Sequence, residues 1–344
     1  MKPEDFGLPV FWYNKEIRKL FFCRGMYLVS MRRKEPIMKN LKPTCSLALV
    51  QAAPVMFDKE KGTEKVLSYI EKCARHGAEL IVFPELFIPG YPYGMTYGFT
   101  VGSRTAEGRK DWMTYYENSL LAGGPEMGRI IESAKAHHVY VSIGYSERDE
   151  VTATLYNSNM MMAPDGTAMN HRKLKPTGSE RVVWGDGNQD FFPVMDTPWG
   201  PMGNLICWES YMPLARCALY EKGISIYISP NTNDNPEWQH TIRHIAIEGH
   251  CYFINADMVF RRSDYPVTAS GTEEIAALPE KVCRGGSCVI DPFGHDASET
   301  LWDEEGVIYA ELDMRKVPAS RMEHDVCGHY ARPDILHLDV KEEK

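Results

Sequence analysis

The sequence predicts an α/β fold, in which short buried strands alternate with amphipathic helices. Three observations point to it: the composition, the alternation of apolar patterns along the chain, and the lack of an evident linker. The 344 residues are 44% hydrophobic and 25% charged, as in an ordinary globular protein. No stretch rich in Gly, Pro or Ser divides residues 45–340, so we expect one large domain there.

The first half of this domain opens with a strand pattern and then a helix pattern. Residues 45–51 are a short apolar run closed by Ala-Ala-Pro, which is typical of a buried strand. Residues 61–76 place apolar side chains along one face of a helix, with Thr63 available as its N-cap and Gly77 to end it. The same patterns predict a helix over 125–139 and strands over 79–83, 140–145, 154–162 and 168–173, with an Asp-Gly hairpin turn between the last two.

The second half of the domain repeats the alternation. Strands are predicted over 203–206, 224–229, 252–260, 287–291 and 307–312, and helices over 212–222 and 237–249. Because strands are mixed with amphipathic helices, we expect helix layers packed on sheets. We find no internal repeat at a fixed short period, which argues against a solenoid.

Charge and cysteine content narrow the class of protein further. A formal net charge of −9 argues against a nucleic-acid binder that works through bulk charge. No apolar run approaches the ~20 residues needed to span a bilayer. The 9 cysteines are an odd number spread over a long chain, which favours reduced thiols and a cytoplasmic location over a disulfide framework.

The cysteines and histidines do not form a recognisable metal motif. No Cys-x-x-Cys pair is present, and Cys283 and Cys288 lack a partner pair of zinc-finger spacing. His240 and His244 have the spacing of half a zinc site on a helix, but no third ligand is nearby, so a structural role is favoured. We therefore predict neither a metal site nor a cofactor.

The two ends of the chain differ from the domain between them. Residues 1–44 carry 10 Lys and Arg against 4 Asp and Glu. Arg24 interrupts the apolar stretch there and no small-residue cleavage pattern follows, so a basic, flexible or loosely docked extension is favoured over a targeting peptide. Residues 341–344 form a short charged C-terminal end.

A carboxylate and a thiol stand at the ends of two predicted strands. Glu85 directly follows an apolar run, where partial burial should raise its pKa toward the range of a general base. Cys207 closes a strand before a helix, where nearby backbone N–H groups and the helix end favour a nucleophilic thiolate. The alternatives are a Glu that caps the next turn and a Cys buried in the core.

A lysine and a second glutamate complete the candidate catalytic set. Lys173 lies at the end of the strand after the Asp-Gly turn, where a cation could favour the charged forms of Glu85 and Cys207 and stabilise a developing anion. Glu180, seven residues later, could orient the lysine ammonium or an attacking water. The alternatives are a solvated basic strand and a surface salt bridge between Glu180 and Arg181.

These stretches together resemble the nitrilase superfamily of carbon–nitrogen hydrolases, and specifically its true nitrilase branch. The likeness runs from about residue 45 to 340, and its most specific part is the cysteine motif with Trp next to the nucleophile. The matching stretches are Phe83-Pro84-Glu85, residues 172–177 (RKLKPT) with Glu180, residues 207–216 (CWESYMPLAR), Gly285-Gly286-Ser287 and residues 328–334 (GHYARPD).

The resemblance implies a four-layer αββα sandwich, with two mixed sheets flanked by helices. It also implies cofactor-free hydrolysis of a nitrile to the carboxylic acid and ammonia through a cysteine thioimidate and thioester. In this mechanism Glu85 is the general base, Lys173 stabilises charge on nitrogen, Cys207 is the nucleophile and Glu180 positions Lys173 or water. Subunits of the family pair through a helix surface, so we expect a homodimer that builds to a larger homo-oligomer.

Three other functions stay open at this point. An amidase or carbamoylase could use the same Glu–Lys–Cys set on other carbon–nitrogen bonds, and a cyanide-hydrolysing enzyme is a further member of this class. A non-catalytic oligomeric binding protein that kept the fold is disfavoured, because a scaffold does not need all three residues.

Aromatic residues are dense in the segment 87–116. They could wall an apolar pocket for an aryl or arylacetonitrile substrate, or equally cover the sheet or join a subunit contact. Tyr91 and Tyr93, together with Trp208 beside the nucleophile, are our candidates for substrate binding.

Overall fold

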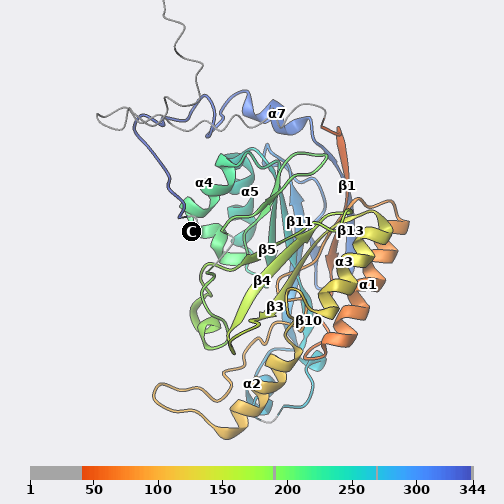
Figure 1. Cartoon of the computed structure of the whole chain (residues 1–344), viewed down its shortest axis with the longest axis vertical. Helices are drawn as coiled ribbons and strands as arrows, with labels where there is room; N and C mark the ends of the chain where they lie inside the picture. The colour runs from red at the N-terminus through yellow and green to blue at the C-terminus, as the bar shows by residue number, and fades with distance from the viewer. Residues whose placement is uncertain (1–40, 189–190, 269, 342–344) are drawn as a thin grey trace, which may run out of the picture. The chain divides into compact units, whose positions relative to one another are not determined.

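The computed structural model describes residues 41–188, 191–268 and 270–341 (Figure 1). Of the predicted basic extension, residues 1–40 lie outside the described part of the chain, as do residues 342–344 of the charged end. The described residues contain no helix long and apolar enough to cross a membrane.

The first sheet is mixed and carries the first half of the domain. Its order is β13-β1-β2-β3-β4-β5, with β1–β2 and β2–β3 parallel and the other neighbours antiparallel. The strands are β1 (Thr44–Gln51), β2 (Leu80–Val82), β3 (Tyr140–Arg148), β4 (Leu155–Met162), β5 (Ala168–Arg172) and β13 (Gly306–Asp313). Helices α1 (Lys59–Arg75) and α3 (Pro125–His137) cover one face.

The second sheet is also mixed and carries most of the second half. Its order is β10-β11-β9-β8-β7-β6, with β12 paired to β11. The strands are β6 (Val194–Met195), β7 (Met202–Asn204), β8 (Ile226–Asn231), β9 (Tyr252–Asp257), β10 (Val259–Arg261), β11 (Lys281–Ile290) and β12 (Leu301–Trp302). Helices α4 (Pro213–Glu221) and α5 (Trp238–Gly249) pack on one face.

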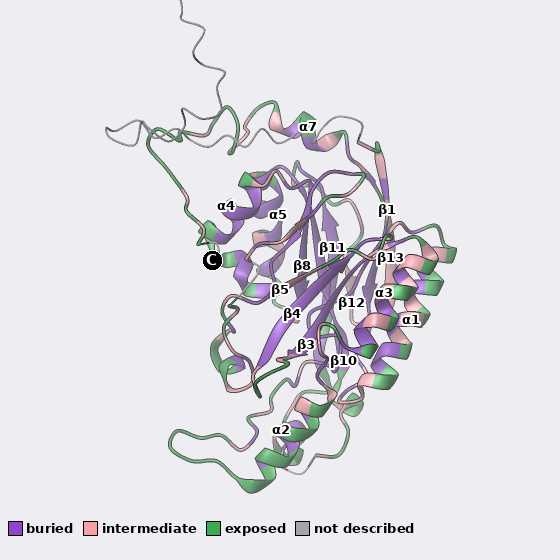
Figure 2. Cartoon of the chain, viewed as in Figure 1, coloured by how far each residue is buried: buried purple, intermediate pink, exposed green. Residues whose placement is uncertain are grey.

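Alternate residues along the strands explain why the two sheets stack. In β1, Ala48 and Val50 pack with α1 and α3, while Leu47 and Leu49 pack in a second core with strands of the other sheet, such as Ile228 in β8. Both faces of the central strands are therefore buried, as Figure 2 shows in purple. The result is four layers in the order helix, sheet, sheet, helix, as the family resemblance implied.

The elements predicted from the apolar patterns are present, with shifted ends. Thr63 is not the N-cap of α1: Asp58 accepts from Lys61 N, and Thr63 lies inside the helix with its hydroxyl donating to Lys59 O. Three helices were not predicted, because their apolar spacing is weak or short. They are α2 (Ala106–Asn118), α6 (Thr272–Ala276) and α7 (Lys316–Arg321).

Gly144 in β3 allows the turn after β2 to approach the sheet closely. A Cβ at this position would lie 2.4 Å from Pro84 O and 2.6 Å from the Cα of Glu85. Both atoms belong to the backbone, so neither can move without displacing Glu85. The position of Glu85 thus depends on a residue without a side chain in the neighbouring strand.

We expect Gly144→Ala to lower the free energy of unfolding by about 1–3 kcal/mol, because it overpacks this contact. Gly128→Ala is the matched control, since Gly128 lies in α3 and a Cβ there meets nothing within 4 Å. The control should be neutral or slightly stabilising because alanine favours the helix. Urea unfolding compares the two, and equal stabilities would contradict the close approach.

Candidate active site

Glu85 lies in the turn directly after β2 and is buried. Its Oε1 accepts hydrogen bonds from Asn157 Nδ2 at 2.7 Å and from Lys173 Nζ at 2.9 Å. Its Oε2 is buried and has no hydrogen-bond partner among the described residues. One carboxylate oxygen is therefore held in place, while the other keeps its lone pairs available for a proton.

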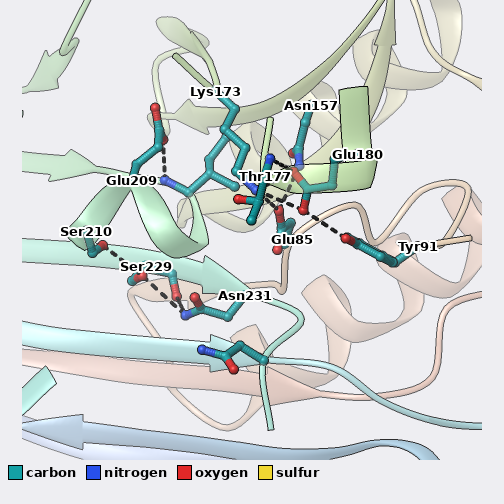
Figure 3. A network of polar contacts seen from close by, with 12 residues as sticks. Glu85, Tyr91, Asn157, Lys173, Thr177, Glu180, Glu209, Ser210, Ser229 and Asn231 are labelled. Atoms are coloured by element: carbon teal, nitrogen blue, oxygen red, sulfur yellow. Dashed lines mark hydrogen bonds and ion pairs between the residues drawn. The ribbon is translucent and has the colours of Figure 1, made fainter. Parts of the chain in front are cut away.

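Lys173 is the first residue after β5 and its side chain is fully buried. The ammonium donates to Glu85 Oε1 and to Glu180 Oε2, both at 2.9 Å. Its backbone is held as well, because Lys173 N donates to Asn157 O at 2.7 Å and Gly187 N donates to Lys173 O at 2.9 Å. Figure 3 shows Glu85 and Glu180 converging on this lysine.

Glu180 lies in a short 3₁₀ helix, η4 (Gly178–Val182), and faces inward. Besides Lys173, its carboxylate accepts from Thr177 N at 2.7 Å and from Tyr91 Oη at 2.8 Å (Figure 3). Arg181 donates instead to Pro176 O, so the surface salt bridge considered above does not form. Tyr91 thus belongs to the same polar cluster as the charged residues.

Cys207 comes from the other sheet. β7 ends at Asn204, and Cys207 begins a second 3₁₀ helix, η5 (Cys207–Tyr211), with a backbone φ of 54°. A non-glycine residue in this left-handed region costs about 1–3 kcal/mol and persists only where the surroundings enforce it. The thiol is thus carried by a tight, strained turn between β7 and α4, where a strand-to-helix turn was predicted, and the strand ends three residues before it.

The ionisable groups of the cluster shift one another's pKa. Burial raises the pKa of Glu85, and Lys173 partly opposes this effect. Burial disfavours the Lys173 ammonium, but Glu85, Cys207 and Glu180 outweigh it and raise the lysine pKa. Burial and the Glu85 charge raise the pKa of Cys207, while Lys173 lowers it. The raised pKa of Cys207 favours the neutral thiol, and the raised pKa of Lys173 favours the ammonium.

The other two proposed substrate-binding residues lie at the surface. Tyr93 and Trp208 are both partly exposed, and Trp208 packs edge-to-face on Tyr211 with ring centroids 5.8 Å apart. Tyr265 ties the tyrosine segment down, because its hydroxyl donates to Tyr93 O at 2.9 Å and Tyr91 O at 3.3 Å.

Two residues of the site were missed by the sequence reasoning. Asn157 donates to Glu85, and Glu209 is a buried carboxylate beside the cysteine turn. The signal for Asn157 was a polar side chain inside the apolar strand 154–162, and that for Glu209 was its place two residues after Cys207. Within the described ranges, no group of three or more His, Cys, Asp or Glu could hold a metal ion.

Comparisons with known proteins agree with this architecture. The family model described as carbon–nitrogen hydrolase matches residues 46–322. An aliphatic nitrilase of Sinorhizobium fredii (strain HH103) is 41% identical over 86% of this chain and 95% of its own length. A tobacco (Nicotiana tabacum) protein named bifunctional nitrilase/nitrile hydratase NIT4B is 39% identical over 87% of each chain.

Solved structures share the fold at lower identity. The NitFhit protein of C. elegans is 19% identical with a TM-score of 0.68, covering 88% of this chain and 69% of that one. Nit3 of Saccharomyces cerevisiae, a member of branch 10 of the nitrilase superfamily, is 21% identical with a TM-score of 0.66, covering 85% and 98%.

We expect Lys173→Met to lower the free energy of unfolding by about 3–5 kcal/mol, because it leaves two buried carboxylates without their cation. Loss of the ammonium raises the folded-state pKa of Glu85 further above its ordinary value. A carboxyl whose pKa is higher in the folded state than in the unfolded state favours the fold at low pH, where it is protonated. This contribution is lost as the pH rises through the folded-state pKa. The deficit should therefore be smaller at pH 5 than at pH 8.

Lys175→Met is the matched control for this variant. Lys175 lies two residues further on, is half exposed and pairs with Asp186 at the surface. Its replacement should change stability by less than about 1 kcal/mol at either pH. Urea unfolding at the two pH values measures both variants, and equal effects would show that the buried cation is not needed.

Proposed function

This chain belongs to the carbon–nitrogen hydrolase family, on its nitrilase branch, and from that premise we propose that it hydrolyses an organic nitrile to the carboxylic acid and ammonia. The observation that carries the proposal is the buried Glu85–Lys173–Glu180 cluster beside Cys207. The cluster supports the proposal because addition of a thiol to a nitrile needs a base, a cation and a nucleophile.

The first half of the reaction forms a covalent thioimidate. Glu85 takes the proton of the Cys207 thiol, and the sulfur forms a bond to the nitrile carbon. The electron pair of one C–N π bond moves to nitrogen, which takes the proton from Glu85 and so leaves the Glu85 carboxylate ionised again. Lys173 and a backbone N–H near Trp208 stabilise the charge on nitrogen while it develops. Cys207 needs such a base because its raised pKa leaves the free thiol protonated at neutral pH.

The second half consumes two waters. One, activated by Glu85 and positioned by Glu180, adds to the thioimidate carbon, and ammonia leaves to give the thioester. The other hydrolyses the thioester and returns the thiol. The sum is one nitrile and two waters converted to one acid and one ammonia. Glu85 suits this repeated proton transfer because burial raises its pKa toward the working range.

An amide is a second product that the same intermediate could release. If the tetrahedral adduct expels the cysteine sulfur in place of ammonia, the product is the amide. We include this branch because two relatives from tobacco, 39% identical, are named bifunctional nitrilase/nitrile hydratase. The amidase or carbamoylase alternative differs from it in requiring turnover of an amide substrate.

The aromatic segment supports a pocket with a largely apolar wall. Tyr91 contacts both Tyr93 and Trp184, with ring centroids 6.1 and 5.8 Å apart. We therefore keep Tyr91 and Tyr93 as substrate-binding residues, with Tyr91 also orienting Glu180. The role of Trp208 in this proposal rests on its backbone beside the nucleophile.

We also propose that the enzyme self-associates and works in the cytoplasm. Several large apolar side chains on and around α4 and α5 are exposed, namely Tyr211, Met212, Leu214 and Ile247, as expected of a subunit contact. The described cysteines are all free thiols, which suits a reducing compartment.

The decisive test is a panel of aliphatic, aryl and arylacetonitriles with detection of ammonia, acid and amide. We expect turnover of at least one nitrile, complete loss of turnover in Cys207→Ala, and retention of it in Cys73→Ala, whose thiol is buried in α1. Turnover of amides without nitriles would favour the amidase alternative. Activity near the wild-type rate in Cys207→Ala would rule out the thiol as nucleophile.

The pH dependence tests Glu85 as the base. Asn157→Ala removes a hydrogen bond that lowers the Glu85 pKa, so the pKa should rise further. Because the base must be ionised, the acidic limb of kcat/KM should move to higher pH by the same amount. Asn159→Ala is the control, since its amide donates to Ser142 Oγ. If the acidic limb of the kcat/KM profile does not move in Asn157→Ala, the limb reports the ionisation of a group other than Glu85.

A further inference from the structure

Glu209 is a buried carboxylate that the mechanism above does not use. It lies in η5, two residues after Cys207, and its side chain is fully buried. It accepts hydrogen bonds from two backbone N–H groups and from one imidazole. A buried anion with this many donors is held in one position, and its partners show what that position does.

The two backbone donors belong to the segments that carry the lysine and the cysteine. Glu209 Oε1 accepts from Leu174 N at 2.6 Å, and Leu174 follows Lys173. Glu209 Oε2 accepts from Ile206 N at 2.6 Å, and Ile206 precedes Cys207. Each oxygen thus holds one of the two segments, and the carboxylate joins the first sheet to the second at the site (Figure 3 shows the contact to the Lys173 segment).

The third donor to Glu209 is His171, which lies in β5 two residues before Lys173. Its Nε2 lies 3.0 and 3.2 Å from the two oxygens of Glu209, while its buried Nδ1 has no hydrogen-bond partner among the described residues. Nε2 is therefore the ring nitrogen that donates, and Glu209 accepts from three N–H groups.

The thiol and the ammonium are not joined by a hydrogen bond of their own. In the described part of the chain, no hydrogen bond joins the Cys207 sulfur to Glu85, Lys173 or Glu180. The turn that carries Cys207 is anchored within its own sheet, where Tyr227 Oη donates to Ser210 Oγ at 2.9 Å. Lys173 is anchored within the first sheet. Apolar packing brings the two segments together, since Leu174 packs against the core cluster that contains Leu205, and the hydrogen bonds that join them in the described residues are those of Glu209.

We infer that Glu209 is a positioning residue that sets the register between Lys173 and Cys207 by holding one backbone N–H of each segment with each carboxylate oxygen. The inference rests on the proposed function, in which Lys173 and Cys207 must lie together for the reaction to proceed. A glutamine could not replace it, because its single oxygen can hold one segment only and its NH₂ group would face the N–H of the other.

The test is Glu209→Gln, with Glu126→Gln as the matched control. Glu126 is also a buried carboxylate, but it lies in the first turn of α3, away from the site, and pairs with Lys59 of α1. Misplacement of reacting groups by about 1 Å can cost about 100-fold in rate. We therefore expect Glu209→Gln to lower kcat about 100-fold with KM within about threefold, and the control to keep both.

A second measurement does not depend on nitrile turnover. Alkylation of Cys207 by iodoacetamide, followed by peptide mass spectrometry, reports the ionisation of its thiol. Lys173 lowers the Cys207 pKa, so a lysine that shifts away raises it. The alkylation profile of Glu209→Gln should move to higher pH, whereas that of Glu126→Gln should coincide with the wild type. A merely structural loss would lower stability without moving the profile.

The outcomes separate this inference from the proposed function. A folded Glu209→Gln protein with wild-type kcat and alkylation profile would overturn the inference while leaving the nitrilase proposal intact. A wild type without nitrile turnover would overturn that proposal, while the alkylation profiles would still test the register. If Glu209→Gln does not fold, Glu209→Asp keeps both carboxylate oxygens on a side chain too short to reach both backbone N–H groups. It should shift the profile in the same direction, and no shift would refute the inference.

Discussion

The site depends on one buried ammonium shared by two carboxylates. Lys173 lies between Glu85 and Glu180, and the three side chains carry a net negative charge in a region from which water is largely excluded. Burying charges is costly unless they are paired and hydrogen-bonded. Here Asn157, Thr177 and Tyr91 supply the remaining donors. The cluster is therefore a structural unit as well as a chemical one, because removing Lys173 leaves two buried carboxylates without their cation.

The two-sheet fold explains why the reacting groups are far apart in sequence. Glu85 and Lys173 follow strands of the first sheet, and Cys207 follows a strand of the second. The apolar layer between the sheets fixes their stacking, and the polar groups gather where the strands end. Strain at Cys207 and the close approach at Gly144 are both local costs that this packing sustains.

The sequence allowed the order of elements to be predicted from its apolar runs, and Glu85 and Cys207 each follow such a run. Lys173 was located by the strand after the Asp-Gly turn, and Glu180 by its spacing from Lys173. The stacking of the sheets could not be derived from periodicity and came only from the family resemblance. Asn157 and Glu209 were missed for a related reason: their partners lie 72 residues away at Glu85 and 35 away at Leu174. Contacts between residues that far apart leave no local pattern in the sequence. The N-cap of α1 was wrong for a different reason, because Asp58 and Thr63 are both residue types that can cap a helix.

The pairing of β1 with β13 has a consequence for how the chain is made. Residues 44–51 pair along their whole length with residues 306–313, so the edge of the first sheet is completed by a segment near the C-terminal end. During synthesis, β1 lacks this neighbour until residues 306–313 have left the ribosome. The half that encodes the base and the lysine is translated early, yet its sheet is closed late, and until then it presents an open strand edge to chaperones and to other nascent chains.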